Sequence, residues 1–304
     1  MILMNPKPDS TPVILVFGGG GQLGRALAEL GPSLSTRAAV VVLDRASADI
    51  TNAGQIEHAF QKLRPALIIN AAAYTAVDAA ESHEAAAFLA NAVGPHHLAL
   101  ACAAARIPLL HVSTDYVFSG TGEVPWNPAD PTAPLNAYGR GKLAGEWAVQ
   151  AAHRDSYIFR TSWIFSPWGN NFVKSMLRLG ASREELAIVS DQHGCPTYAV
   201  DLAEGLLLIA AGLLEGRPYP PGIYHFSNSG ATTWFDFADA IFETAAAGGY
   251  VRPRLRPIPT SDYPSPATRP LWSVLDCSET TRHFGLTIPP WRDALQRCMD
   301  RLAR

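Results

Sequence analysis

The chain has 304 residues, 48% of them hydrophobic, and a formal net charge of −3. This length suffices for one large domain or two modest ones, and the weak negative charge gives no reason to expect a nucleic acid or an anionic membrane as partner. We see no apolar run of the roughly 18–20 residues that span a bilayer, and the first twelve residues, MILMNPKPDSTP, lack the pattern of a signal peptide. We therefore expect residues 1–12 to form a flexible lead-in.

The cysteines and histidines give no sign of a metal site. The four cysteines are scattered and form no C-x-x-C pair, which is typical of free thiols in a reducing cytoplasm (Cys102, Cys195, Cys277 and Cys298). His96 and His97 are adjacent on an expected helix, so their side chains point in different directions. We predict a cytoplasmic protein with no structural metal.

Apolar runs alternate with helical stretches over the first half of the chain. Each predicted strand is a continuous apolar run, as expected for a strand buried on both faces of a parallel sheet. In chain order, we predict a strand at 13–18, a helix at 21–30, strands at 39–44 and 66–70, a helix at 84–106 with a kink at Gly94-Pro95, a strand at 108–114, a long loop at 115–137, a helix at 138–153 and a strand at 156–163. This order predicts an α/β fold, a Rossmann-type doubly wound parallel sheet with helices on both faces.

The rhythm of strands and helices loosens after about residue 165. Short helices near 170–180, 200–212 and 233–247 alternate with the strand-like LAIVSD and GIYHFSN, and a last helix begins near Pro290. We predict a dinucleotide-binding domain at 13–165 and a smaller α/β substrate lobe at 166–304, some segments of which return to the first domain. A cleft between the two parts is the expected ligand site.

A glycine-rich turn follows the first predicted strand. FGGGGQLG places Gly18, Gly21 and Gly24 three residues apart where the strand meets the next helix. Glycines permit a tight turn and a close approach of a pyrophosphate, and the helix N-terminus offers free N–H groups. The spacing differs from G-x-G-x-x-G, but its position between a strand and a helix predicts a dinucleotide site, to which Gln22 and Leu23 also belong.

Residues after the second and third strands extend this predicted cofactor site. Asp44 ends the second strand 20 residues past Gly24, where an acid binds the adenosine ribose hydroxyls. Arg45 follows it, and an arginine there can bind a 2′-phosphate, so the choice between NADH and NADPH stays open. Further cofactor contacts are expected from DITN near the adenine and from NAAAYT at the sheet edge, namely Asp49, Ile50, Ala71, Ala72, Ala73 and Thr75.

YGRGK places Tyr138 and Lys142 four residues apart. The pair lies on one face of a helix, and a nearby ammonium lowers the pKa of a phenol. By itself the pattern is more typical of a solvated helix face than of a catalytic pair. STDYVF at 113–118 and the glycine turn precede it in the chain, and together these motifs indicate a catalytic pair.

The chain resembles the dTDP-4-dehydrorhamnose reductase family of extended short-chain dehydrogenase/reductases. The resemblance covers nearly the whole sequence, and its more specific motifs are NAAAYTAVDAAE, HVSTDYVFSG, APLNAYGRGKLAGE, RTSWIF, GNNFVKSML, DQHGCPT, GIYHFSNSG and RPLWSVLD. The run of four glycines and the longer lead-in depart from the family pattern.

The resemblance implies reduction, by NADPH or NADH, of the C4 ketone of a dTDP-linked 4-keto-6-deoxyhexose. It implies that Tyr138 donates the proton, that Lys142 lowers the tyrosine pKa and binds the nicotinamide ribose, and that Thr114 hydrogen-bonds the carbonyl. The resemblance also implies residues that bind the substrate. These are Asp115, Tyr116 and Trp163 at the sugar, and Asn171 and Arg269 at the diphosphate.

Three other functions remain open from sequence. One is a ketoreductase for another nucleotide-linked deoxysugar, which would use the same catalytic residues. The second is a non-catalytic, NADP-binding regulatory subunit, against which the joint presence of Thr114, Tyr138 and Lys142 argues. The third is an epimerase with tightly bound NAD. The sequence does not determine the oligomeric state; a homodimer is the assembly that we consider.

Overall fold

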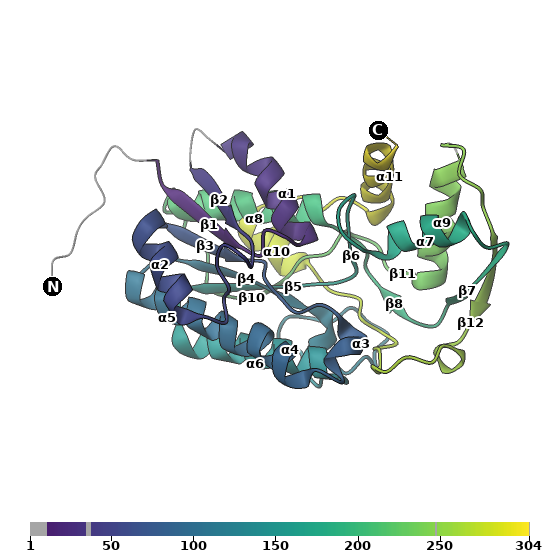
Figure 1. Ribbon diagram of the computed structural model, residues 1–304, viewed down its shortest axis with the longest axis horizontal. Helices are drawn as coiled ribbons and strands as arrows, with labels where there is room; N and C mark the ends of the chain where they lie inside the picture. The colour runs from purple at the N-terminus through teal and green to yellow at the C-terminus, as the bar shows by residue number, and fades with distance from the viewer. Residues whose placement is uncertain (1–10, 35–37, 247, 304) are drawn as a thin grey trace.

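A six-stranded parallel sheet forms the centre of the computed structural model, which describes residues 11–34, 38–246 and 248–303 (Figure 1). The first ten residues of the predicted lead-in lie outside the described residues. The strand order is β10-β5-β4-β3-β1-β2. The strands are β1 (Val13–Phe17), β2 (Ala39–Leu43), β3 (Leu67–Asn70), β4 (Leu109–Thr114), β5 (Ser156–Thr161) and β10 (Gly222–His225).

Both faces of this sheet are buried under helices, as the continuous apolar runs predict. Ile14 and Val16 belong to the core on one face, and Leu15 and Phe17 to the core on the other. Figure 1 shows the two helical layers. One layer holds α1 (Gln22–Leu30) and α8 (Ala199–Leu214), and the other holds α2 (Ala53–Leu63), α5 (Gly94–Ala105) and α6 (Ala137–Ala152). The predicted doubly wound fold is confirmed.

The predicted kink at Gly94-Pro95 corresponds to a break in helical geometry. The run consists of α4 (Glu84–Phe88), the π-helical turn η2 (Leu89–Val93) and α5. Pro95 has no N–H to donate to the preceding turn. The helix can accommodate this missing hydrogen bond by widening locally, as the π-helical turn η2 does. Contrary to the sequence reading, this 22-residue run is long and apolar enough to span a bilayer by length and composition. It packs along α6 and α2, and a core helix meets the same criterion.

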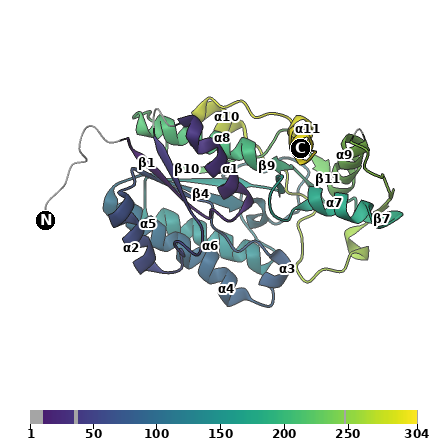
Figure 2. The ribbon, with the colours of Figure 1, turned by 45° about the horizontal axis from the view of Figure 1, so that its top comes forward.

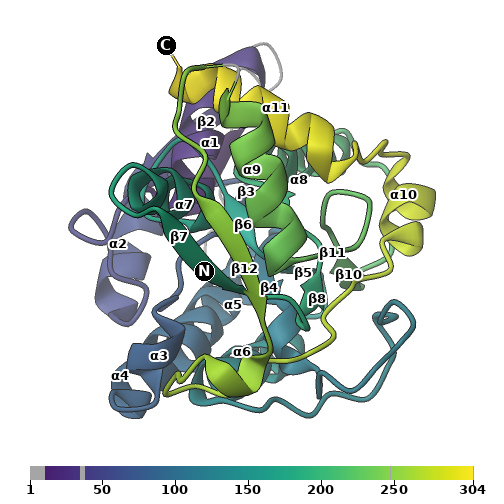
Figure 3. The same cartoon turned by 90° about the vertical axis from the view of Figure 1, so that its right-hand side faces the viewer.

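A second group of elements lies beyond the carboxyl ends of the large sheet (Figures 1 and 3). Its helices are α7 (Phe172–Gly180), α9 (Trp234–Ala246) and α11 (Trp291–Leu302). Its strands pair in twos: β7 (Glu185–Val189) with β12 (Arg254–Ile258), β6 (Ile164–Phe165) with β9 (Thr197–Tyr198), and β8 (His193–Gly194) with β11 (Thr232–Thr233).

The chain crosses between the two groups several times. After β9 it returns to the large sheet through α8 and β10, and after β12 it passes through α10 (Ser278–Phe284) to α11 (Figure 2). Segments after residue 166 therefore contribute strand β10 to the large sheet and helix α8 to one of its faces. The sequence analysis did not identify α2, which Asn52 caps through its side-chain oxygen, or the four-residue helix α3 (Val77–Ala80).

Two glycines of α6 differ in the space beside them. A Cβ added at Gly145 would lie 2.1 Å from the Asn91 carbonyl oxygen of η2, whereas one at Gly141 would lie 3.5 Å from the Asn91 Cβ. We expect Gly145→Ala to reduce the free energy of unfolding by about 1–3 kcal/mol, because the backbone of η2 must move away from the added methyl group. The matched Gly141→Ala should be neutral or stabilising by up to about 1 kcal/mol, since alanine favours helix. Urea denaturation measures both; equal effects would contradict this packing.

Candidate active site

A cavity of about 790 Å³ lies at the carboxyl ends of the large sheet, against the second group of elements. Most residues that the sequence predicted for cofactor and sugar line it. On the cofactor side these are Gly18, Gly21, Gln22, Leu23, Arg45, Asp49, Ile50, Ala71, Ala72, Ala73 and Thr75. On the catalytic and sugar side they are Thr114, Asp115, Tyr116, Tyr138, Lys142 and Trp163. Gly24, Asp44, Asn171 and Arg269 do not line it.

The glycine turn between β1 and α1 leaves room beside the backbone. Gly18 has φ +99°, and a Cβ there would lie 2.5 Å from the backbone of Ala71. A Cβ on Gly24 would lie 2.2 Å from the Gly18 oxygen, so this glycine permits α1 to pack on the turn and does not itself face the cavity. The start of α1 thus points its free N–H groups into the cavity, an arrangement that suits a pyrophosphate.

The end of β2 differs in detail from the sequence prediction. Asp44 is exposed, and its Oδ1 accepts hydrogen bonds from the Ser47 N–H (2.8 Å) and hydroxyl (2.6 Å). The hydrogen bond from the Ser47 hydroxyl lowers the pKa of this carboxyl. Arg45 and Asp49, which do line the cavity, form an ion pair at 2.9 Å. An acid, Asp49, and a base, Arg45, therefore both border this end of the cavity.

Tyr138, Lys142 and Thr114 come together on the floor of the cavity. Asn136 caps α6 by accepting from the Gly139 N–H at 2.8 Å, and this fixes the first turn that contains Tyr138. The Tyr138 side chain lies beside Thr114, at the end of β4, close enough for the Thr114 hydroxyl to lower the pKa of the phenol. One turn further along α6, the Lys142 Nζ donates to the Val112 carbonyl at 2.6 Å. The helical spacing thus places both side chains against the same strand.

Burial determines the ionisation of both α6 groups. It raises the pKa of Tyr138 to about 12, against the effect of the neighbouring Thr114 hydroxyl, which lowers it. Burial also lowers the pKa of Lys142 to about 8, against the neighbouring Glu146 charge, which raises it. The sequence argument, in which Lys142 depresses the tyrosine pKa, gave the wrong net direction, because spacing reveals the partner but not the loss of solvent.

A fully buried ion pair lies behind Lys142. The Arg160 guanidinium of β5 donates to the Glu146 carboxylate of α6 through Nε (2.9 Å) and Nη2 (2.7 Å). The side chains are 3% and 0% exposed, so no water screens their attraction. The Ser113 hydroxyl of β4 also donates to Glu146. The sequence analysis did not identify this network, since its members are far apart in the chain.

Two tryptophans form the wall opposite the catalytic residues. Trp163 has φ +48°, and its ring stacks on that of Trp234 with 3.5 Å between centroids and 8° between planes. A Cβ at Gly194 would lie 2.5 Å from the Trp163 ring, so the glycine is required for this position. Tyr116 packs edge-to-face on Tyr138 at 5.7 Å. These rings therefore present aromatic surface to the cavity, a kind of surface that suits the apolar face of a sugar.

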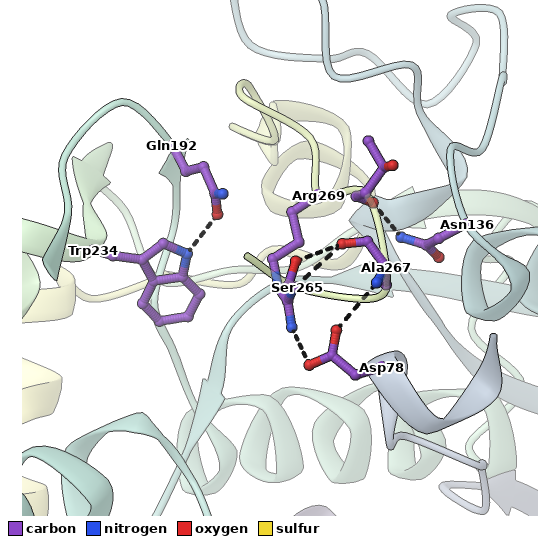
Figure 4. A network of polar contacts seen from close by, with 8 residues as sticks. Asp78, Asn136, Gln192, Trp234, Ser265, Ala267 and Arg269 are labelled. Carbon is purple, nitrogen blue, oxygen red and sulfur yellow. Dashed lines mark hydrogen bonds and ion pairs between the residues drawn. The ribbon is translucent and has the colours of Figure 1, made fainter. Parts of the chain in front are cut away.

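Two predicted diphosphate residues have internal partners. Asn171 caps α7, accepting from the Lys174 N–H, and its Nδ2 donates to Gln22 at 3.0 Å, so its amide is used within the fold. Arg269 pairs with Asp78 at 2.7 Å, as Figure 4 shows, while Gln192 accepts from the Trp234 indole in the same view. Arg269 also interacts electrostatically with the Tyr116 phenol, which lines the cavity.

The comparisons with known proteins point to one family. The model of the RmlD substrate binding domain matches residues 12–304. A dTDP-4-dehydrorhamnose reductase of Burkholderia thailandensis is 43% identical over 94% of this chain and 97% of its own length, and one of Streptomyces griseus is 44% identical over 96% and 94%. The chain belongs to the dTDP-4-dehydrorhamnose reductase family. The resemblance seen in the sequence is thus confirmed.

Solved structures agree with this assignment. A crystal structure of dTDP-4-dehydrorhamnose reductase from Bacillus anthracis in complex with NADP superposes with a TM-score of 0.87 at 36% identity, covering 96% of this chain and all of that one. A UDP-glucose 4-epimerase of Thermus thermophilus, at 21% identity and TM-score 0.74, shares the fold. Both structures are complexes with a nicotinamide cofactor, NADP in the first and NAD in the second.

Several cavity residues were missed by the sequence analysis. Many of them adjoin or belong to the quoted motifs, as Gly169 and Asn170 do in GNNFVKSML, so extending the predicted sites by a residue or two would have found them. Trp234 gave no such signal. The missed residues are Gly20, Ala48, Thr51, Tyr74, Val77, Ala90, Val112, Ser113, Thr161, Ser162, Ile164, Gly169, Asn170 and Trp234.

Removal of Glu146 should destabilise the protein strongly. Glu146→Ala leaves the buried Arg160 charge without its partner, a change that typically costs about 3–5 kcal/mol of unfolding free energy. The control is Glu84→Ala, which removes the exposed ion pair with Arg140, worth less than about 1 kcal/mol. Urea titration at neutral pH gives both values. Similar losses for the two variants would mean that the Arg160 charge is screened or neutralised in some other way.

Proposed function

We propose that this member of the family reduces the C4 ketone of dTDP-4-dehydro-L-rhamnose to dTDP-L-rhamnose, with NADPH or NADH as reductant. The observation on which the proposal rests is that Tyr138 and Thr114 line one cavity together with Lys142, which lies one helical turn after Tyr138 on α6. The same cavity extends to the glycine turn, so a dinucleotide and a sugar can meet above these residues.

The residues present fit a reduced nicotinamide dinucleotide. The turn at Gly18 and the open start of α1 would bind the pyrophosphate, and Arg45 with Asp49 would face the adenosine ribose. Ala71, Ala72 and Ala73 are small enough to let the cofactor lie on the sheet edge. When bound, the cofactor supplies the hydride for C4.

Tyr138 supplies the proton in this proposal. Its raised pKa keeps the phenol protonated across the physiological range, so it acts as a general acid. Lys142 lies one turn after Tyr138 on α6 and lines the same cavity; in this proposal its charge stabilises the phenolate that remains, and it binds the nicotinamide ribose. Thr114, which lines the cavity beside the phenol, is the proposed hydrogen-bond partner of the ketone oxygen.

The sugar and nucleotide are assigned to the outer part of the cavity. Trp163, supported by Trp234, covers the apolar face of the hexose, and Asp115 and Tyr116 border it. Arg269 is the proposed diphosphate contact, because its guanidinium already interacts with an anion, Asp78, beside Tyr116. The internal bonding of Asn171 leads us to assign it to positioning Gln22, not to the diphosphate.

Three expectations from sequence remain proposals. A division of labour between a dinucleotide-binding part at 13–165 and a substrate-binding part at 166–304 is supported by the residues on each side of the cavity. A cytoplasmic location is supported by the four free cysteines. A homodimer is a further proposal, which sedimentation would test.

A substrate comparison tests the proposed function. The purified protein is supplied with dTDP-4-dehydrorhamnose generated in situ, and oxidation of NADPH or NADH is followed. The dTDP-linked ketosugar should be reduced, while the free ketosugar should lose in kcat as well as in KM, because remote binding energy orients the reacting carbon. Equal turnover of the free sugar, or no net oxidation of cofactor, would overturn the proposal.

Tyr138→Phe should lower kcat by about 10²–10⁴-fold, the usual contribution of a general acid, while cofactor binding persists. The matched control is Tyr198→Phe, which removes another buried hydroxyl, outside the cavity and without a partner among the described residues. Steady-state kinetics and cofactor titration by fluorescence measure the two effects. A Tyr138→Phe enzyme with near-normal turnover would remove this residue from the acid role.

Cofactor preference should respond in opposite directions to substitutions at two neighbours. Arg45→Ala should reduce kcat/KM for NADPH relative to NADH by about tenfold, because a cation near the 2′-phosphate is lost. Asp44→Ala should shift the same ratio towards NADPH, since it removes a carboxylate at that strand end. Both ratios come from initial rates with each cofactor. An unchanged ratio in both variants would place the adenosine ribose elsewhere.

A further inference from the structure

A short segment, residues 265–269, is fixed by contacts before and after it in the chain. Before it, the Thr260 N–H and hydroxyl donate to the Asp191 carboxylate at 2.9 and 2.6 Å. After it, Pro270 lies against Gly120, which has φ +74°, and a Cβ on that glycine would lie 2.5 Å from the Pro270 Cα. The 265–269 segment therefore runs between two anchored points of the fold.

Two side chains from the side of the cavity that holds Tyr138 fasten this segment (Figure 4). The Asn136 Nδ2 donates to the Thr268 carbonyl at 2.8 Å. Asp78 of α3 uses both carboxylate oxygens: Oδ1 accepts from the Ala267 N–H at 3.3 Å, and Oδ2 accepts from the Arg269 Nη2 at 2.7 Å. Asn136 and Ala267 are buried, so the segment belongs to the packed fold and is not a loose loop.

Asp78 holds Arg269 at both ends of its side chain. One carboxylate oxygen fixes the backbone two residues before Arg269, and the other fixes the guanidinium. The Ala267 carbonyl accepts from the Arg269 Nη1 at 3.4 Å. A guanidinium has five N–H groups, and these are its two hydrogen bonds to the residues that the structure describes, so the other N–H groups remain for an anion. A side chain that is already fixed loses less conformational freedom when it binds.

Both anchors of the segment adjoin the cavity that the substrate would enter. Val77, which precedes Asp78, lines the cavity, and so does Tyr138, two residues after Asn136. The Arg269 side chain is 20% exposed, so solvent or a ligand can reach it beside these residues. An arginine in this position suits a phosphate group that extends outward from a sugar held above Tyr138.

We propose that Asp78 is a positioning residue that directs the Arg269 guanidinium towards the substrate diphosphate, and thereby sets the preference for a nucleotide-linked over a free ketosugar. The inference rests on the proposed function, which assigns the diphosphate to Arg269. The opposite relation is competition, in which Asp78 and the diphosphate exclude one another from the guanidinium. The two relations predict opposite effects of removing the carboxylate.

Calorimetric titration of dTDP into the protein saturated with NADP⁺ tests the inference without turnover. Asp78→Ala should raise the Kd of dTDP by about tenfold, because Arg269 loses the partner that fixes it. Asp78→Asn keeps an acceptor oxygen for the guanidinium and should stay within about threefold of the unmodified protein. The matched control is Asp239→Ala, which removes a part-exposed carboxylate from Arg252 outside the cavity and should leave the Kd unchanged. Tighter binding of dTDP by Asp78→Ala would overturn the inference in favour of competition.

A double substitution distinguishes positioning from general damage to the fold. Arg269→Ala should raise the Kd of dTDP by at least about tenfold, since it removes a cation from the diphosphate. Adding Asp78→Ala to Arg269→Ala should change the Kd by less than about threefold, because Asp78 acts through Arg269. Losses that add in the double variant would mean that Asp78 acts on binding by another route, and would overturn the inference.

Steady-state kinetics separates this inference from the proposed function. The ratio of kcat/KM for the dTDP-linked ketosugar to that for the free ketosugar should fall by about tenfold in Asp78→Ala, because only the linked substrate has a diphosphate to lose. Equal falls for both substrates, or an unchanged Kd of dTDP in an active reductase, would overturn the inference alone. The expected changes in Kd, without reduction of the dTDP-linked ketosugar, would instead overturn the proposed function.

Discussion

Glu146 connects three elements of the fold at one buried point. Its carboxylate accepts from Arg160 on β5 and Ser113 on β4, and it lies one turn after Lys142 on α6. Because a buried carboxylate requires such partners, the position of α6 along the ends of the strands is closely defined. The relation between Tyr138 and Thr114, on which the chemistry depends, follows from the same placement.

Loss of solvent is the second determinant of the site. It moves the pKa of the Tyr138 phenol up to about 12, that of the Lys142 ammonium down to about 8 and that of the Asp115 carboxyl up to about 7. Each shift favours the neutral form, and together they leave a proton on the phenol in a cavity where a developing charge interacts strongly with its neighbours. Burial thus keeps the phenol protonated at neutral pH, while making it a weaker acid than a phenol in water.

The sequence predicted those parts of the site that depend on local geometry. The turn at Gly18 follows from a strand running into a helix, and the pairing of Tyr138 with Lys142 follows from helical spacing. It did not predict Trp234, because its contact with Trp163 bridges 71 residues of chain, or the Arg269–Asp78 pair for the same reason. The direction of the Tyr138 pKa was wrong, since burial is a property of the assembled fold and not of spacing.

The central claim is that hydride reaches C4 of a dTDP-linked ketosugar above a protein-derived proton donor. The most direct test uses reduced cofactor deuterated at the transferring position and proton NMR of the isolated product. The account predicts dTDP-L-rhamnose with deuterium at C4 and none at the neighbouring carbons. Product without deuterium, or with the opposite configuration at C4, would contradict the account, because the ketone would then lie elsewhere or face the other way in the cavity.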